Sequence, residues 1–194
     1  MSKMTTTFGA TAILTALAVS PVLAHIEPGQ SGQPTWSDRM ASGGVQTMLT
    51  QAAEQMSEDD YAFRPTPEVR TFGQIMAHVA DANFAMCAMA KGEQPPVRDI
   101  EKTKTTKPEI QKALAESFAY CDGLRDALPD VRAKATVEFM GIIVPAPKML
   151  ELATYHNLSH YGNAVVYMRL RGKVPPSSQP GALSAPEPPT PAGK

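Results

Sequence analysis

The sequence has little of what a nucleic-acid-binding protein needs. Its 18 basic residues are balanced by 19 acidic ones, which gives a formal net charge of −1, so the chain has no basic surplus to attract a phosphate backbone. Aromatic residues make up 6% of the chain and include one tryptophan, too few for a base-stacking platform. We therefore expect no nucleic acid partner. At 194 residues we expect one folded domain.

Long apolar runs are also scarce, and the clearest one lies at the N-terminus. The segment MSKMTTTFGATAILTALAVSPVLA has one early lysine, an apolar stretch from Ala10 to Val19 and the small-x-small pattern Val22-Leu23-Ala24. This pattern predicts a secretory signal peptide over residues 1–24. A membrane helix needs about 20 apolar residues, and Pro21 leaves this run short. We expect export to the periplasm with no membrane span after cleavage; a retained anchor is the alternative.

Cysteine occurs twice, as Cys87 and Cys121. In an exported protein both would meet an oxidising compartment, where disulfides persist, and an even number fits one bridge. Because the two cysteines fall on separate predicted helices, we expect the bridge to join those helices. The alternative is two reduced thiols that pack as small apolar residues.

Glycine and proline concentrate near the two ends of the mature chain. Residues 25–35 (HIEPGQSGQPT) are predicted to be a flexible linker, and residues 174–194 a proline-rich disordered tail that cannot bury a core. His25 would be the mature N-terminus and could chelate Cu(II) through its amine and ring, although the flexible surroundings argue against a built site. The folded domain is then residues 36–173.

Within this domain, apolar spacing and helix-end signals predict four long helices and no strong strands. Thr71 is a suitable N-cap for the second helix, and Pro108 suits the first turn of the third. We interpret residues 57–70 as a loop, and residues 135–139 and 142–144 as two short extended pieces. The pattern indicates an all-α protein, a four-helix bundle. The predicted helices cover residues 37–56, 71–91, 107–128 and 147–171.

Half of the chain's four histidines lie in the short stretch YHNLSHYGN. His156 and His160 are four residues apart, so a helix places them on one face, which we expect to be the middle of the apolar stripe. His78 lies within an apolar stripe of the second helix. Because a bundle turns such stripes toward one another, we expect the three imidazoles to meet.

Three imidazoles in an apolar interior are costly, because charged rings repel one another and neutral rings need partners for both nitrogens. A divalent metal (zinc, nickel or iron) removes this cost and leaves positions for water. Hydrogen-bonded core histidines are the alternative, and the protease signature H-E-x-x-H is absent. Asp81 could orient His78 or complete the coordination, or lie solvated at the rim. Tyr167 shares the histidine face and could contact a metal-bound water or substrate, or pack in the core.

The segments YHNLSHYGNAVVYMRLRGKVPPSS and TFGQIMAHVADAN resemble the last and second helices of DinB-like proteins, particularly exported bacterial members. The resemblance covers roughly residues 36–178. It implies a four-helix bundle with up-down-down-up connectivity and a divalent metal held by three histidines, which map to His78, His156 and His160. The position before the last histidine, often acidic in such proteins, is Ser159 here.

Members of this family include thiol-dependent S-transferases and a maleylpyruvate isomerase. The resemblance therefore implies a metal-dependent transferase or hydrolase acting on a small molecule through a metal-bound water or thiolate. Export disfavours cytosolic thiol cofactors, so hydrolysis stays open. The sequence identifies no catalytic residue beyond the expected ligands. The alternative is a non-catalytic metal- or ligand-binding bundle, and a homodimer could form through an exposed helix face.

Overall fold

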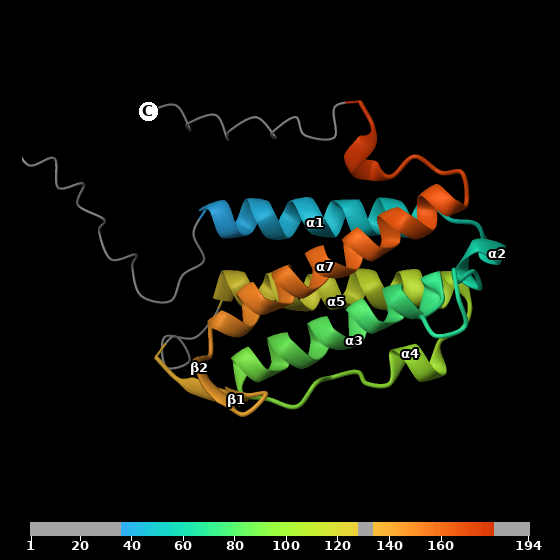
Figure 1. The fold of residues 1–194 in the computed structure, drawn as a ribbon. Coiled ribbons are helices and arrows are strands. Elements are labelled where there is room, and N and C mark those ends of the chain that lie inside the picture. Colours follow the sequence, from blue (N-terminus) through green and yellow to red (C-terminus); the bar gives the residue numbers. More distant parts are fainter. Residues whose placement is uncertain (1–35, 128–133, 181–194) are drawn as a thin grey trace, which may run out of the picture.

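The computed structural model describes residues 36–127 and 134–180 and forms a bundle of four long helices (Figure 1). The all-α four-helix bundle predicted from the sequence is confirmed. The expected signal peptide, the linker, His25 and residues 181–194 of the expected tail lie outside the described residues. The long helices are α1 (Trp36–Gln55), α3 (Phe72–Lys91), α5 (Lys107–Ala127) and α7 (Lys148–Leu170), and the short elements are α2 (Glu58–Tyr61), α4 (Ile100–Thr103), β1 (Thr136–Phe139), β2 (Ile142–Pro145) and the 3₁₀ helix η1 (Pro176–Ser178).

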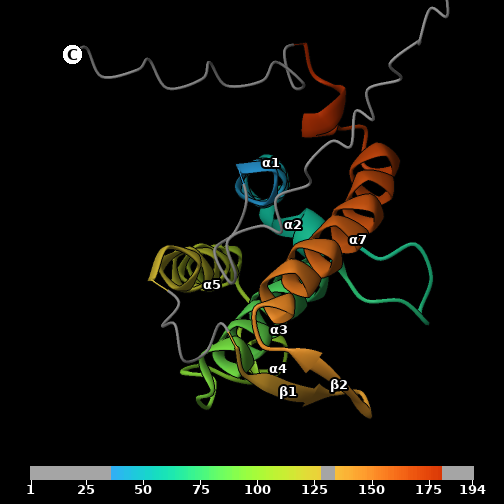
Figure 2. The ribbon, with the colours of Figure 1, turned by 90° about the vertical axis from the view of Figure 1, so that its left-hand side faces the viewer.

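The connectivity of the bundle is up-down-down-up. In Figure 1, α1 and α7 run in one direction along the bundle, and α3 and α5 run in the other. Because α3 and α5 are parallel, the segment between them, residues 92–106, travels back along the bundle and carries α4 on the way. We call residues 92–106 the crossing segment. Seen nearly end-on, the long helices follow one another around the bundle in the order α1, α5, α3, α7 (Figure 2).

Local sequence explains where α3 begins and ends. Thr71 accepts a hydrogen bond from the backbone of Gln74 while the Gln74 side chain accepts one from the backbone of Thr71, a reciprocal capping box. At the other end Gly92 takes a left-handed conformation with φ 81°, which glycine adopts without strain. Both ends agree with the prediction, and they fix the register of the helix that carries His78.

Two short helices were missed from the sequence. The predicted loop 57–70 contains α2, which Ser57 and Asp60 begin with a second capping box. The crossing segment contains α4, whose first two backbone N–H groups, those of Ile100 and Glu101, both donate to the Asp81 carboxylate at 2.9 Å. Single-turn helices give no periodic pattern, so only their caps could have indicated them.

The core centres on α3, which packs against α5 and α7. Near the end of α3, Cys87 and Cys121 form a disulfide that joins α3 to α5. The predicted bridge between the second and third long helices is therefore confirmed. By the loop-entropy argument, a bridge that closes a loop of 34 residues stabilises the fold by about 3–4 kcal/mol.

The chain between α5 and α7 contains an antiparallel hairpin, β1 and β2, at the two predicted extended pieces. Its turn residues Met140 and Gly141 both have positive φ, as two-residue hairpin turns require. After α7 the packed chain continues past Lys173: Pro176 is buried, and the backbone N–H of Ser177 donates to the Tyr161 hydroxyl at 2.8 Å.

Within the described ranges, no helix is both long and apolar enough to cross a bilayer.

Candidate metal centre

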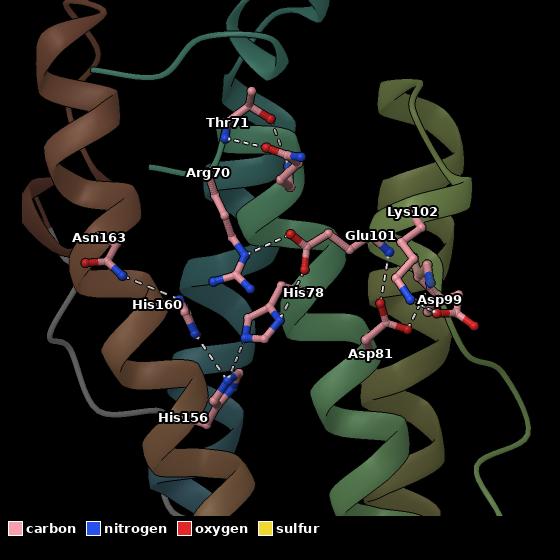
Figure 3. Close-up of polar contacts among 12 residues, drawn as sticks. Arg70, Thr71, His78, Asp81, Asp99, Glu101, Lys102, His156, His160 and Asn163 are labelled. Atoms are coloured by element: carbon pink, nitrogen blue, oxygen red, sulfur yellow. Dashed lines mark hydrogen bonds and ion pairs between the residues drawn. The ribbon is translucent and has the colours of Figure 1, made fainter. Parts of the chain in front are cut away.

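The structure brings His78, His156 and His160 together between α3 and α7 (Figure 3). Nε2 of His156 lies 3.2 Å from Nε2 of His78 and also 3.2 Å from Nε2 of His160. One nitrogen from each ring lies within 4.8 Å of the other two. The convergence expected from helical spacing is therefore present.

The spacing of these nitrogens fits a shared metal ion. Two nitrogens bound tetrahedrally to one zinc ion at about 2.0–2.1 Å are about 3.3–3.4 Å apart. Hydrogen bonding alone satisfies the cluster poorly, because Nε2 of His156 makes both 3.2 Å contacts and carries at most one proton. Such a nitrogen offers either one N–H or one in-plane lone pair, so only one of the two contacts can be a well-directed hydrogen bond. A cation at the centre would accept all three lone pairs and remove the conflict.

The surroundings keep the three rings uncharged at neutral pH. Burial, followed by the neighbouring rings and Arg70, lowers the pKa of His156 to about 4. Burial, His78 and Arg70 lower the pKa of His160 to about 4 as well. Burial and Arg70 also lower the pKa of His78, and nearby Glu101 opposes this shift. Neutral imidazole is the form that binds metals, so the site presents three lone pairs without first releasing protons.

The prediction that His156 and His160 lie in the middle of the buried stripe of α7 is wrong. All three histidines are half-buried. The stripe is centred on Ala153, Asn157 and Ala164, with His156 and His160 at its edge. This edge position leaves one side of the cluster toward solvent, which a site that exchanges ligands requires.

The residue beside His78 is Glu101, which the sequence analysis did not identify. Its Oε2 lies 3.4 Å from Nδ1 of His78, and its Oε1 accepts a hydrogen bond from Nε of Arg70 at 2.8 Å. A carboxylate on Nδ1 favours the tautomer whose Nε2 lone pair points to the centre. The crossing segment supplies this carboxylate, and its Ile100 is fully buried where the segment docks on α3.

Asp81 makes its hydrogen bonds away from the histidine rings, and Tyr167 takes the second role considered for it, that of a core residue. The Asp81 carboxylate caps α4 and so positions the neighbouring Glu101, while Glu101 itself approaches His78. The Tyr167 hydroxyl donates to the carbonyl of Arg70 at 2.7 Å, and the residue is buried. Each acts on the cluster through another residue: Asp81 through Glu101, and Tyr167 through Arg70.

A buried polar network lies behind His156. Nδ2 of Asn157 donates to Oδ1 of Asn83 at 3.0 Å, and Nδ2 of Asn83 donates to Oγ of Ser117 at 3.1 Å, so the network joins α7, α3 and α5. In the described chain, Nδ1 of His156 and Oδ1 of Asn157 are both buried without a hydrogen-bond partner. With Nε2 on a metal, Nδ1 carries the proton and needs an acceptor, and the adjacent amide oxygen is available.

A wide groove of about 1350 Å³ lies between the crossing segment and the outer side of α3. Glu101 and Asp81 are among its lining residues, and none of the three histidines is. Charges of both signs line this groove, including Glu93, Arg98 and Lys102. The groove and the histidine cluster are therefore separate features that share Glu101.

The fold and the cluster define a class: helical bundles in which histidines from two helices could hold one metal ion. The model of the DinB superfamily matches residues 44–164, and the chain belongs to this superfamily. The chain is 26% identical over 128 residues to the uncharacterized protein YjoA of Bacillus subtilis, covering 64% of this chain and 82% of YjoA.

Solved structures show the same fold. The crystal structure of YjoA, a DinB-like protein, matches with a TM-score of 0.56 and 20% identity, covering 70% of this chain and 93% of that one. A DinB-like protein from Bacillus cereus matches with a TM-score of 0.58 and 18% identity, covering 72% and 91%. The resemblance noted in the sequence is confirmed at the level of family and fold.

Proposed function

We propose that this protein is an exported, divalent-metal-dependent enzyme that transfers or hydrolyses a group on a small molecule. The observation that carries the proposal is the pair of 3.2 Å contacts that places the Nε2 atoms of three neutral histidines around one point. Zinc, nickel and iron all accept imidazole ligands. A divalent ion held there would polarise a substrate and lower the pKa of a water or thiol in its open position.

Each residue of the candidate site has its own role in this proposal. His78, His156 and His160 would hold the ion, and Glu101 would keep the His78 ring in the correct tautomer. The half-buried rings keep part of their surface exposed to solvent. Arg70 adds a positive charge beside the cluster.

Metal or ligand binding without catalysis is the second candidate function. It is favoured by the engagement of both nearby carboxylates, since Asp81 binds the backbone of α4 and Glu101 faces Arg70 and His78. Within the described residues this leaves no obvious general base beside the histidines.

Elemental analysis of protein purified without a histidine tag tests the metal site. We expect about one divalent ion per chain in the wild type and its loss in His156→Ala. His25→Ala, the same change in the one histidine that is not a proposed ligand, is the matched control and should keep the ion. Equal metal content in wild type and His156→Ala would refute the proposed ligand set.

Catalysis needs a separate measurement, because metal binding alone fits both candidates. The metal-loaded protein would be assayed for hydrolysis of small esters and thioesters and for thiol transfer, with His156→Ala as the blank. A metal-dependent rate above the blank supports the enzyme. Full metal occupancy with no such rate across the panel favours the binding protein.

Support for export comes from the N-terminal pattern and from the Cys87–Cys121 disulfide, since disulfides persist in oxidising compartments. Mass spectrometry of the protein from a periplasmic fraction tests it. The expected mature chain begins at His25 and is two mass units lighter than its reduced form. A full-length chain found in the cytoplasm with both thiols reduced would contradict export.

A further inference from the structure

Arg70 is held beside the histidine cluster by two other elements. Its carbonyl accepts from the Tyr167 hydroxyl of α7, and its Nε donates to Glu101 of the crossing segment at 2.8 Å. Figure 3 shows the guanidinium next to the imidazoles of His78 and His160, with its terminal nitrogens toward them. Anchoring at both the backbone and Nε gives a long, flexible side chain a defined direction.

The two terminal nitrogens of Arg70 are available to a ligand. Nε is the donor to Glu101, and neither Nη atom has a hydrogen-bond partner among residues 36–127 and 134–180. The side chain is 43% exposed, so a molecule arriving from solvent can reach it. A planar guanidinium with a free edge matches the two oxygens of a carboxylate or phosphate.

The charges around the cluster point to the same class of ligand. Glu101 and Arg70 form an ion pair and cancel each other, and the three ligand atoms of the candidate site are imidazole nitrogens with no carboxylate among them. A divalent ion would therefore add two positive charges with no anionic protein ligand beside them, and the charge of such an ion dominates its surroundings. An anionic ligand compensates this excess, whereas a neutral or cationic ligand does not.

We propose that Arg70 is the substrate-binding residue of this site and that the substrate carries an oxyanion group, a carboxylate or a phosphate, held between the guanidinium and the metal. This inference rests on the proposed metal site. It adds the charge class of the substrate and assigns a residue to its recognition. Glu101 then has two functions, because it orients His78 on one side and sets the direction of Arg70 on the other.

Cobalt-loaded protein gives a direct binding measurement, because the visible absorption of Co²⁺ responds to a ligand at its open position. The mature full chain would be titrated with acetate and with inorganic phosphate, and with acetamide as the neutral counterpart of acetate. We expect saturable spectral changes with at least one anion and none with acetamide at equal concentration. Comparing acetate with phosphate shows which oxyanion the site prefers.

Substitution of Arg70 isolates its contribution. Arg70→Gln should weaken anion binding at least about tenfold, since a hydrogen bond to a charged group is lost, while the cobalt content is kept. Arg70→Lys keeps the positive charge but loses the pair of parallel N–H donors, and this variant should bind the anion with intermediate affinity. Arg64→Gln removes an exposed arginine of the same loop, whose Nη1 donates to the Pro67 carbonyl, and should leave the affinity unchanged. Should Arg70→Gln lose cobalt or fail to fold, Arg70→Lys provides the comparison.

Metal content separates the two possible failures. Wild-type protein that holds no divalent ion would overturn the proposed function, and the anion site with it. Wild-type protein that holds cobalt but shows no anion response, or the same affinity in wild type and the Arg70 variants, would overturn the anion site alone.

Discussion

The Oε2 atom of Glu101 lies 3.4 Å from Nδ1 of His78, on the far side of the ring from the Nε2 atom that faces the cluster. The two residues come from different parts of the bundle, the crossing segment and α3. A ring held at both nitrogens has one orientation and one tautomer. We therefore regard Glu101 as part of the metal site, although it contacts the ligand His78 and would not bind the ion itself.

Glu101→Gln should lower the affinity of the protein for zinc by about 10–100-fold, because the amide no longer strengthens the Nδ1–H dipole of His78. Competition with a fluorescent chelator measures this affinity. Glu93→Gln is the matched control, since Glu93 lies on the same crossing segment and pairs with Lys91. Equal zinc affinity in the wild type and in both variants would show that Glu101 does not support His78.

Asn157→Leu should weaken zinc binding and also destabilise the fold by about 1–3 kcal/mol, because it removes the acceptor beside His156 and leaves Oδ1 of Asn83 without its donor. Ser117→Ala is the control, since it breaks the same network on the side away from the cluster. Chemical denaturation and chelator competition report the two effects separately. A loss of stability without any loss of zinc affinity in Asn157→Leu would assign the residue to packing alone.

The metal-free protein should lose stability as the pH falls from about 6.5 to about 4. His156 and His160 have their pKa lowered from 6.5 to about 4 in the folded chain, so in this window the unfolded chain binds protons that the folded chain does not. Above pH 6.5 both rings are neutral in the folded and the unfolded chain, so they no longer make the free energy of unfolding depend on pH. Urea midpoints across the window measure the slope.

A double substitution tests the origin of this slope. His156→Gln with His160→Gln should flatten the decline between pH 6.5 and 4 while leaving the acid loss from carboxylates in place. Asp60, whose pKa is lowered by hydrogen bonds from Ser57 and Arg171 against its burial, contributes such a loss at lower pH. An unchanged slope in the double variant would mean that the two rings titrate normally.

Replacing Cys87 and Cys121 together by alanine should lower the free energy of unfolding by about 3–4 kcal/mol. Zinc content should be unaffected, because Cys87 is nine residues after His78, about 13 Å along α3 and on its opposite side. Reduction of the wild type by dithiothreitol should reproduce the loss. Full stability after replacement would indicate that the thiols are not bridged in solution.

The long helices were predictable because each has a strong local signal. Apolar spacing and the Thr71 cap placed α3 to within one residue. The four-residue helices α2 and α4 have too few turns for periodicity, and the contact of α4 with Asp81 is tertiary. The strands of the hairpin, by contrast, lie at the two short extended pieces expected from the sequence.

The three histidines of the candidate site could be predicted from the sequence, but the residues that support them, such as Glu101, could not. Helical spacing and the family resemblance identified the three histidines. Asn157 lies at the centre of the buried face of α7 although it is polar. A buried face predicted from apolar residues alone was therefore shifted toward the histidines. Glu101 reaches His78 only because two helices run parallel, and no local pattern in the sequence contains that information.

The parallel course of α3 and α5 has an evolutionary consequence. Since the chain must return along the bundle between them, a carboxylate partner of the cluster comes from a connection outside the close-packed interior. A substitution at Glu101 that keeps the buried Ile100 leaves the core intact, so descendants of this scaffold can exchange that carboxylate, and with it the preferred ion or reactivity, while the helices that hold the imidazoles stay the same.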